Sequence, residues 1–253
     1  MQFDLRDGNN KATFQCYTLS GSSKMRRHPV RLSAIVINSR NPNYFAVGGS
    51  DKYARVYDIR KVHWGEQSND DNPVSSFYPA HLKGKGSVHV TALAYSFQEE
   101  LLVSYNDEHI YLFEKLGSFE NMQDDEKGCL PTNELQVYKG HRNARTVKGV
   151  SFLGPNTEYV VSGSDCGNVF IWRKKDANLV ALFKGDTQVV NCLEPHPHIT
   201  VLATSGIDNT AKVWAPIAED YVPLPVDAEK VISGFSNSLY YTREHQYEVI
   251  YQH

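Results

Sequence analysis

The feature that most limits the fold of this chain is a pattern that recurs four times. Each copy has a run of β-branched and aromatic residues, a turn of small residues closed by an acid, and a second run that ends in an aromatic residue. β-branched and aromatic side chains favour strands, whereas Gly, Ser, Asp and Asn favour turns, so each copy predicts a β-hairpin. The copies occupy residues 45–58, 101–114, 159–172 and 201–214.

Flanking segments extend each hairpin to a larger unit. Alternating runs precede the four hairpins, at residues 32–37, 90–95, 147–152 and 189–193. Short runs at 74–78 and 179–183 follow two of them and are candidate outer strands. Four antiparallel strands per unit are the layout of a propeller blade, and 43 residues separate Asp165 from Asp208, within the blade spacing of about 40–45 residues. The sequence therefore predicts an all-β propeller with about four blades plus the end of another.

The repeat also predicts the domain organisation. Its expected parts are the end of a preceding blade (1–22), a blade at 23–88, a blade with an acidic loop insertion at 89–136, blades at 137–187 and 188–225, and an irregular tail at 226–253. The fourth blade is expected to lack a clear outer strand, because Pro216, Pro223 and Pro225 cannot donate to a sheet ladder. An arc of this kind has open ends, so we expect either a small closed propeller or a piece of a longer protein.

Composition excludes several classes of function. The formal net charge of −3 argues against a nucleic-acid-binding surface, and no apolar run approaches the length of a membrane span. The four cysteines are far apart, which fits neither a disulfide framework nor a zinc site. His196 and His198 flank Pro197 without a third ligand nearby, and no nucleophile or phosphate-binding motif occurs. We therefore expect no metal, no cofactor and no enzymatic activity.

The strand pattern does not explain one motif, an acid followed two residues later by an arginine. Arg60 follows Asp58 by two residues at the end of a predicted strand, and residues 3–6 repeat the same aromatic-Asp-aliphatic-Arg order with Asp4 and Arg6. Alternation places the acid and the arginine on one face, where an exposed pair contributes only about 0–1 kcal/mol. A solvated charge pair is therefore one interpretation. The other is a pair of arginines on one rim of the propeller, where the planar guanidinium suits a protein interface.

These motifs resemble those of known families. The chain resembles WD40 repeat proteins over about residues 1–215, with Lys139-Gly140-His141 ahead of Trp172. Residues 45–60 resemble the DWD box, the WD-x-R motif of many substrate receptors that dock on the DDB adaptor of cullin-4 ubiquitin ligases. Residues 3–6 supply a second, partial box. Three stretches of the later repeats are similar in sequence to the DDB- and cullin-associated factor 8 group. They are residues 138–143, 146–150 and 194–198.

The resemblance implies roles for particular residues. Adaptor contacts fall to Arg60, Arg6, Asp58, Tyr57 and Asp4, and structural roles to His141, Trp172, Asp51, Asp107, Asp208 and Trp214. The sequence departs from the family where Cys166 occupies the usual slot of the turn acid. No copy then holds the full hydrogen-bonded chain of His, Asp, Ser or Thr and Trp, so stability is expected to depend on apolar packing between blades.

The resemblance also implies a function. It predicts a non-catalytic receptor in the nucleus or the cytoplasm, whose partners are the DDB adaptor and an unknown protein substrate. A general WD40 scaffold of another complex is the alternative. A basic cluster of Arg142, Asn143, Arg145 and Lys148 is expected to be a solvated loop, which could lie on a rim that faces the substrate.

Overall fold

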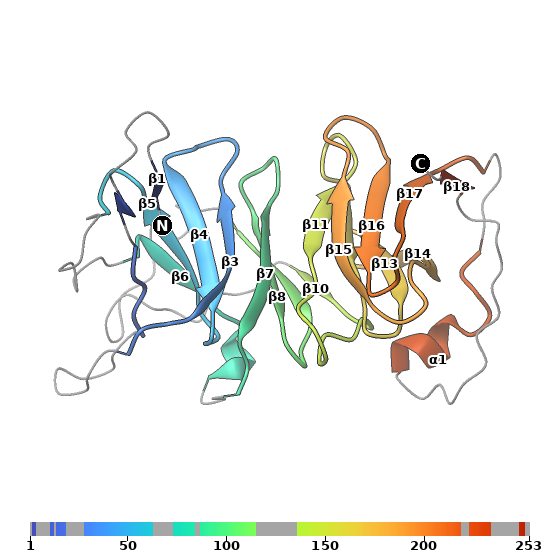
Figure 1. Ribbon diagram of the computed structural model, residues 1–253, viewed down its shortest axis with the longest axis horizontal. Coiled ribbons are helices and arrows are strands. Elements are labelled where there is room, and N and C mark those ends of the chain that lie inside the picture. The colour runs from blue at the N-terminus through green and yellow to red at the C-terminus, as the bar shows by residue number, and fades with distance from the viewer. Residues whose placement is uncertain are drawn as a thin grey trace.

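Four antiparallel sheets of four strands each follow one another along the chain (Figure 1). The computed structural model describes residues 2–3, 11–12, 14–18, 28–62, 73–83, 87–114, 136–218, 223–233 and 248–250. The first sheet contains β3 (Leu32–Ile37), β4 (Tyr44–Gly49), β5 (Ala54–Asp58) and β6 (Ser75–Phe77). The second contains β7 (Val90–Tyr95), β8 (Leu101–Tyr105), β9 (Ile110–Phe113) and β10 (Gln136–Tyr138).

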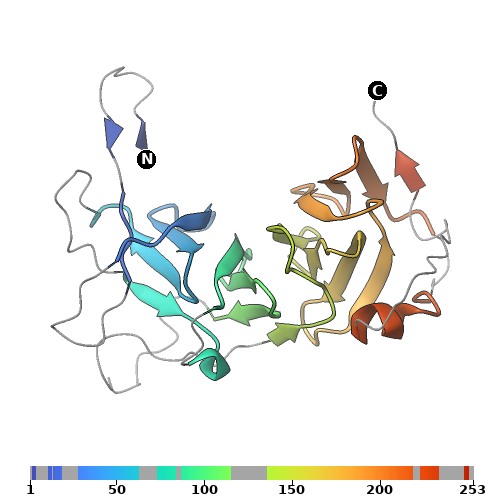
Figure 2. The same cartoon turned by 60° about the horizontal axis from the view of Figure 1, so that its bottom comes forward.

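The other two sheets repeat this order. The third contains β11 (Val150–Leu153), β12 (Tyr159–Ser162), β13 (Asn168–Arg173) and β14 (Leu179–Lys184). The fourth contains β15 (Val190–Pro195), β16 (Leu202–Gly206), β17 (Ala211–Ala215) and β18 (Glu248–Ile250). The first strands β3, β7, β11 and β15 lie next to one another in turn, and the sheets form an open arc (Figure 2). The predicted all-β, partial-propeller fold is confirmed.

Apolar side chains fill the spaces between consecutive sheets, as expected from the sequence. Val56 and Phe77 of the first sheet pack with Phe113 of the second. Leu112 of the second sheet packs with Trp172 of the third. The third and fourth sheets share a third cluster, which includes Ile171, Trp214 and Val161. Neighbouring sheets therefore bury the faces that they turn toward each other.

The N-terminal segment covers part of the open face of the first sheet. β1 (Gln2–Phe3) pairs with β2 (Lys11–Ala12) in a small separate sheet, and Tyr17 forms an isolated bridge with Pro29. Phe14 lies edge-on to Phe45 and Tyr57, at ring-centroid distances of 5.6 and 4.9 Å. Ile35 and Ile37 on the same sheet remain 69% and 60% exposed. Phe14 and Cys16, which belong to the segment expected to end a preceding blade, therefore pack on this sheet.

The structure differs from the sequence-based domain organisation in three respects. The second sheet extends to Tyr138, because β10 pairs with β9 rather than opening the next blade at residue 137. The fourth sheet has an outer strand after all, since β18 pairs with β17. This strand lies well beyond Pro216, Pro223 and Pro225 in the sequence, so the prolines do not prevent it. The expected irregular tail also contains a short helix, α1 (Ala228–Ser233), which buries Ala228 and Val231 against the core between the second and third sheets.

A 3₁₀ turn, η1 (Ala80–Leu82), precedes β7 and buries Leu82. No helix among the described residues is long and apolar enough to cross a membrane.

One buried amide ties the second sheet to the loop that enters the third. The side chain of Asn143 donates to Thr91 Oγ1 at 2.8 Å, to Ser104 Oγ at 3.2 Å and to the carbonyl oxygen of Tyr105 at 2.9 Å. Asn143 is only 3% exposed. The sequence suggested a solvated loop at this position, but the loop is anchored here by three hydrogen bonds.

We expect Asn143→Ala to lower the free energy of unfolding by about 1–3 kcal/mol, because it leaves buried acceptors without their donor. Urea denaturation measures this change. The matched variant is Arg142→Ala at the exposed neighbouring position, which should change the free energy by no more than about 0.5 kcal/mol. Equal losses in the two variants would contradict the anchoring role.

Candidate protein-interaction site

Arg60 is held at the end of β5 by a carboxylate that is itself buried. Its Nε donates to Asp58 Oδ1 at 2.9 Å and its Nη2 to Asp58 Oδ2 at 2.7 Å, and its backbone N–H also reaches Oδ1 at 3.0 Å. The Asp58 side chain is 3% exposed and the Arg60 side chain 61%. Hydrogen bonds from Arg60 lower the pKa of Asp58 to about 2, so the pair is charged at neutral pH. The guanidinium is thus fixed in orientation while it faces solvent.

Tyr57 packs in the apolar cluster on one face of this strand end. Its ring stacks on Phe45 at 5.7 Å, and its hydroxyl lies 3.5 Å from Cys16 Sγ. Tyr57 is only 2% exposed, and alternation along β5 turns it to the face opposite Asp58, the residue that holds Arg60. The prediction that Tyr57 takes part in an interface is therefore corrected: it can position the strand, but it does not reach a partner surface.

The second predicted arginine cannot be placed. Asp4 and Arg6 lie outside the described residues, which in that segment include only the backbone of β1 and β2. The pairing of two arginines on one rim therefore stays a prediction.

Three of the four turn acids are matched by a cation. Asp51 pairs with the buried Arg55, whose Nη1 donates at 2.8 Å, and Asp208 pairs with Lys212 at 2.7 Å. Both cations follow the acid by four residues, so the spacing was visible in the sequence. Asp107 differs, because it is exposed and takes up a backbone φ of 50° in the turn. Among the described residues its backbone N–H, and not its side chain, has a partner, the carbonyl of Asn143 at 3.0 Å.

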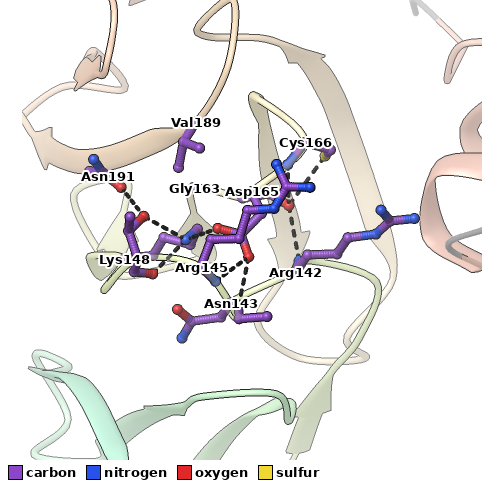
Figure 3. A network of polar contacts seen from close by, with 12 residues as sticks. Arg142, Asn143, Arg145, Lys148, Gly163, Asp165, Cys166, Val189 and Asn191 are labelled. Atoms are coloured by element: carbon purple, nitrogen blue, oxygen red, sulfur yellow. Dashed lines mark hydrogen bonds and ion pairs between the residues drawn. The ribbon is translucent and has the colours of Figure 1, made fainter. Parts of the chain in front are cut away.

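The third turn acid is the centre of the network in Figure 3. Asp165 Oδ1 pairs with Lys148, and its Oδ2 accepts the backbone N–H groups of Ala144 at 2.6 Å and Arg145 at 2.9 Å. Lys148 has no exposed side-chain surface and also donates to Thr146. Burial alone would raise the pKa of Asp165, but the hydrogen bonds from Lys148 and from the two N–H groups outweigh burial and lower it. Lys148 is therefore not part of a solvated cluster.

The aromatic residues predicted to be structural are buried without a complete hydrogen-bonded chain. Trp214 Nε1 donates to Thr204 Oγ1 at 2.8 Å, but Trp172 Nε1 donates to the carbonyl of Lys139 at 3.1 Å. His141 lies edge-on to Trp172 at 6.1 Å, and neither of its ring nitrogens has a hydrogen-bond partner among the described residues. Burial lowers the pKa of His141 to about 3, so its ring is neutral.

Two further polar groups were not assigned a role from the sequence. Asp186 accepts the N–H groups of Gln188, Val189 and Asp208. His81 lies 3.2 Å from the hydroxyl of Tyr111. No group of three His, Cys, Asp or Glu side chains that could hold a metal occurs in the part of the chain that the structure describes.

Comparison with known proteins agrees with this architecture. The family described as "WD domain, G-beta repeat" matches residues 132–173 and 177–215. Each match runs from the outer strand of one sheet into the next sheet, as β10 to β13 and β14 to β17 do. The chain contains WD40 repeats.

Several curated proteins are similar to these WD40 repeats over part of the chain. The human protein "DDB1- and CUL4-associated factor 6" is 48% identical over 98 residues, 38% of this chain. The mouse "WD and tetratricopeptide repeats protein 1" is 51% identical over 83 residues, 32% of the chain. The Arabidopsis thaliana "Protein ALTERED SEED GERMINATION 2" is 43% identical over 106 residues, 40% of the chain. The aligned segments span only 11%, 12% and 14% of these relatives.

We expect either half of the buried Asp165–Lys148 pair to be costly to lose alone. Asp165→Asn and Lys148→Met should each lower the free energy of unfolding by about 3–5 kcal/mol, since each leaves the partner charge buried without its counter-ion. The double variant should lose less than the sum of the two. Urea denaturation of the four proteins gives the coupling, and additive losses would contradict a paired role.

His141 makes the stability of the fold sensitive to mild acid. Its pKa falls from the ordinary 6.5 to about 3 on folding, so below pH 6.5 the unfolded chain binds a proton that the folded chain does not. Stability should therefore drop by about 2 kcal/mol between about pH 7 and about pH 5. Thermal unfolding of His141→Leu should show a much weaker pH dependence, with a remainder from His109, whose pKa burial also lowers. The exposed His198→Gln is the control and should keep the wild-type slope.

Proposed function

We propose that this chain is a non-catalytic substrate receptor that docks on the DDB adaptor of a cullin-4 ubiquitin ligase through the rim that carries Arg60. The observation that carries the proposal is the geometry of that arginine. Its guanidinium is fixed by two hydrogen bonds to a buried carboxylate, and its side chain is 61% exposed. The protein requires no cofactor for this role, and the nucleus or the cytoplasm is its proposed compartment.

An arginine held in this way suits a protein interface. Because Asp58 fixes the orientation, little side-chain entropy is lost when a partner binds. The Asp58 contacts use the Nε edge, and no described residue bonds to Nη1. A partner carboxylate or backbone carbonyl can therefore bind the outer edge of the guanidinium without breaking the internal pair.

The relatives give independent support for this direction. One protein similar to the WD40 repeats carries in its name an association with DDB1 and CUL4. That similarity covers a minority of the present chain and a ninth of the relative, so the ligase role is our proposal. The second box around Arg6 and the likeness to the factor 8 group remain predictions of the sequence.

A general WD40 scaffold is the second candidate. One observation favours it: the Arg60–Asp58 pair is complete within the chain and needs no partner to satisfy the buried carboxylate. In that case the arginine serves only to end the strand, and binding to other proteins uses other surfaces.

The test is binding of the purified chain to the purified adaptor. Arg60→Ala should weaken binding by roughly tenfold or more, as expected when one charged hydrogen-bonding group at an interface is removed. Arg60→Lys should also weaken it, because lysine keeps the charge but lacks the planar fork. Isothermal titration calorimetry measures both.

The matched control is Arg31→Ala, which removes an exposed arginine of the same sheet at the opposite end of the strands. It should bind the adaptor like the wild type. Unchanged affinity in Arg60→Ala, or no adaptor binding by a folded wild-type chain, would favour the general scaffold.

A further inference from the structure

The rim opposite Arg60 has a hollow between the second and third sheets. In the first sheet, the turn acid Asp51 precedes β5 and Arg60 follows it, so the two mark opposite ends of the strands. The hollow is lined by the turn acids of the next two sheets, Asp107 and Asp165, and by residues 141–145. Its volume is about 450 Å³. A ligand here would therefore leave the Arg60 rim free.

Two arginines line the hollow without forming an ion pair with any described residue. Arg142 and Arg145 are exposed, and neither side chain has a partner among the described residues. The nearby Asp165 bonds to neither side chain, and its oxygens instead contact Lys148 and two backbone N–H groups. Figure 3 shows both arginine side chains leaving the loop on the side of Cys166, away from Lys148. Their charge is available to a ligand.

Buried polar groups in the same lining also lack partners. Both ring nitrogens of His141, which is 8% exposed, have no hydrogen-bond partner among the described residues. The same holds for Oδ1 of Asn143, which is 3% exposed. Unsatisfied buried polar atoms are uncommon in folded proteins, and at a surface hollow they are positions that a ligand can satisfy. Oδ1 accepts a hydrogen bond, and a neutral imidazole can both donate and accept.

We propose that this hollow binds a peptide segment that carries an acidic side chain. The carboxylate would lie against Arg142 and Arg145, which are the exposed cations of the hollow. The loop needs little rearrangement, because Asn143 and the two N–H groups bound to Asp165 already fix it. That this peptide belongs to the ligase substrate rests on the proposed function, whereas the peptide binding itself does not.

The charges around the hollow favour a peptide over a nucleic acid. Asp107 is exposed and Glu108 also lines the hollow, so a chain of phosphates would meet two carboxylates beside the two arginines. The net charge of the whole chain is −3, and nucleic-acid affinity depends mainly on neutralising many phosphates. A single acidic side chain needs only the arginine pair.

The test is selection of a randomised peptide display library on the immobilised full chain, without the adaptor. Selected peptides should be enriched in Asp or Glu at one position. One selected peptide is then synthesised. Its affinity for the chain should fall roughly tenfold when that acidic residue is replaced by Asn or Gln. The Arg142→Gln, Arg145→Gln double variant should show the same loss and should no longer discriminate between the two peptides.

A matched control distinguishes loss of the binding site from a change in the net charge of the chain. Arg173→Gln with Lys175→Gln removes the same charge from exposed positions away from the hollow and should select the same peptides as the wild type. No acidic enrichment, or equal enrichment on the Arg142/Arg145 double variant, would overturn the proposal. So would tighter binding of a single-stranded oligonucleotide or of a phosphoserine peptide through the same arginines, because each assigns the hollow to phosphate.

The outcome is independent of the adaptor experiment. Arg60→Ala should select the same peptides as the wild type, since it lies on the other rim. If the wild-type chain binds the adaptor but selects no acidic peptide, only the present inference fails. If acidic peptides bind but the adaptor does not, the receptor role fails and the peptide site stands.

Discussion

In three of the four sheets, the rim geometry of this protein depends on an ion pair to the acid in the turn between the second and third strands. In the first and fourth sheets, a cation four residues later supplies the counter-charge, as Arg55 and Lys212 do. In the third sheet that position holds an apolar residue, and Lys148 supplies the charge from the loop before β11. Because the same carboxylate binds two backbone N–H groups of residues 144–145, the loop is locked to the turn.

This arrangement replaces the hydrogen-bonded chain that is usual in the family. His141 is present but neutral and unpaired, and Trp172 bonds to a backbone carbonyl instead of to a strand hydroxyl. Apolar packing between sheets then stabilises the arc, while ion pairs hold the turns of three sheets in place. The two rims consequently differ in chemistry. One presents an arginine whose own carboxylate is buried beneath it, and the other presents two arginines to whose side chains the turn acid does not bond.

Much of this was visible in the sequence, and the exceptions have physical causes. The hairpins were predictable because small turn residues separate strand-forming runs with a regular spacing. β11 begins at Val150 rather than at residue 147, and Lys148 in the preceding loop pairs with Asp165. The pairing of β18 with β17 was not predicted because the two strands are far apart in the sequence. The helix α1 was not predicted because its six residues are too few for a periodic signal. The roles of Tyr57 and Lys148 depend on burial, which residue type alone does not reveal.

Hydrogen–deuterium exchange of the chain with and without the adaptor distinguishes the two rims. We expect the adaptor to protect the amides of residues 58–61, at the end of β5, and to leave those of residues 141–146 unchanged. Protection confined to residues 141–146, or none at the β5 end in a complex that does form, would contradict the assignment of the two rims.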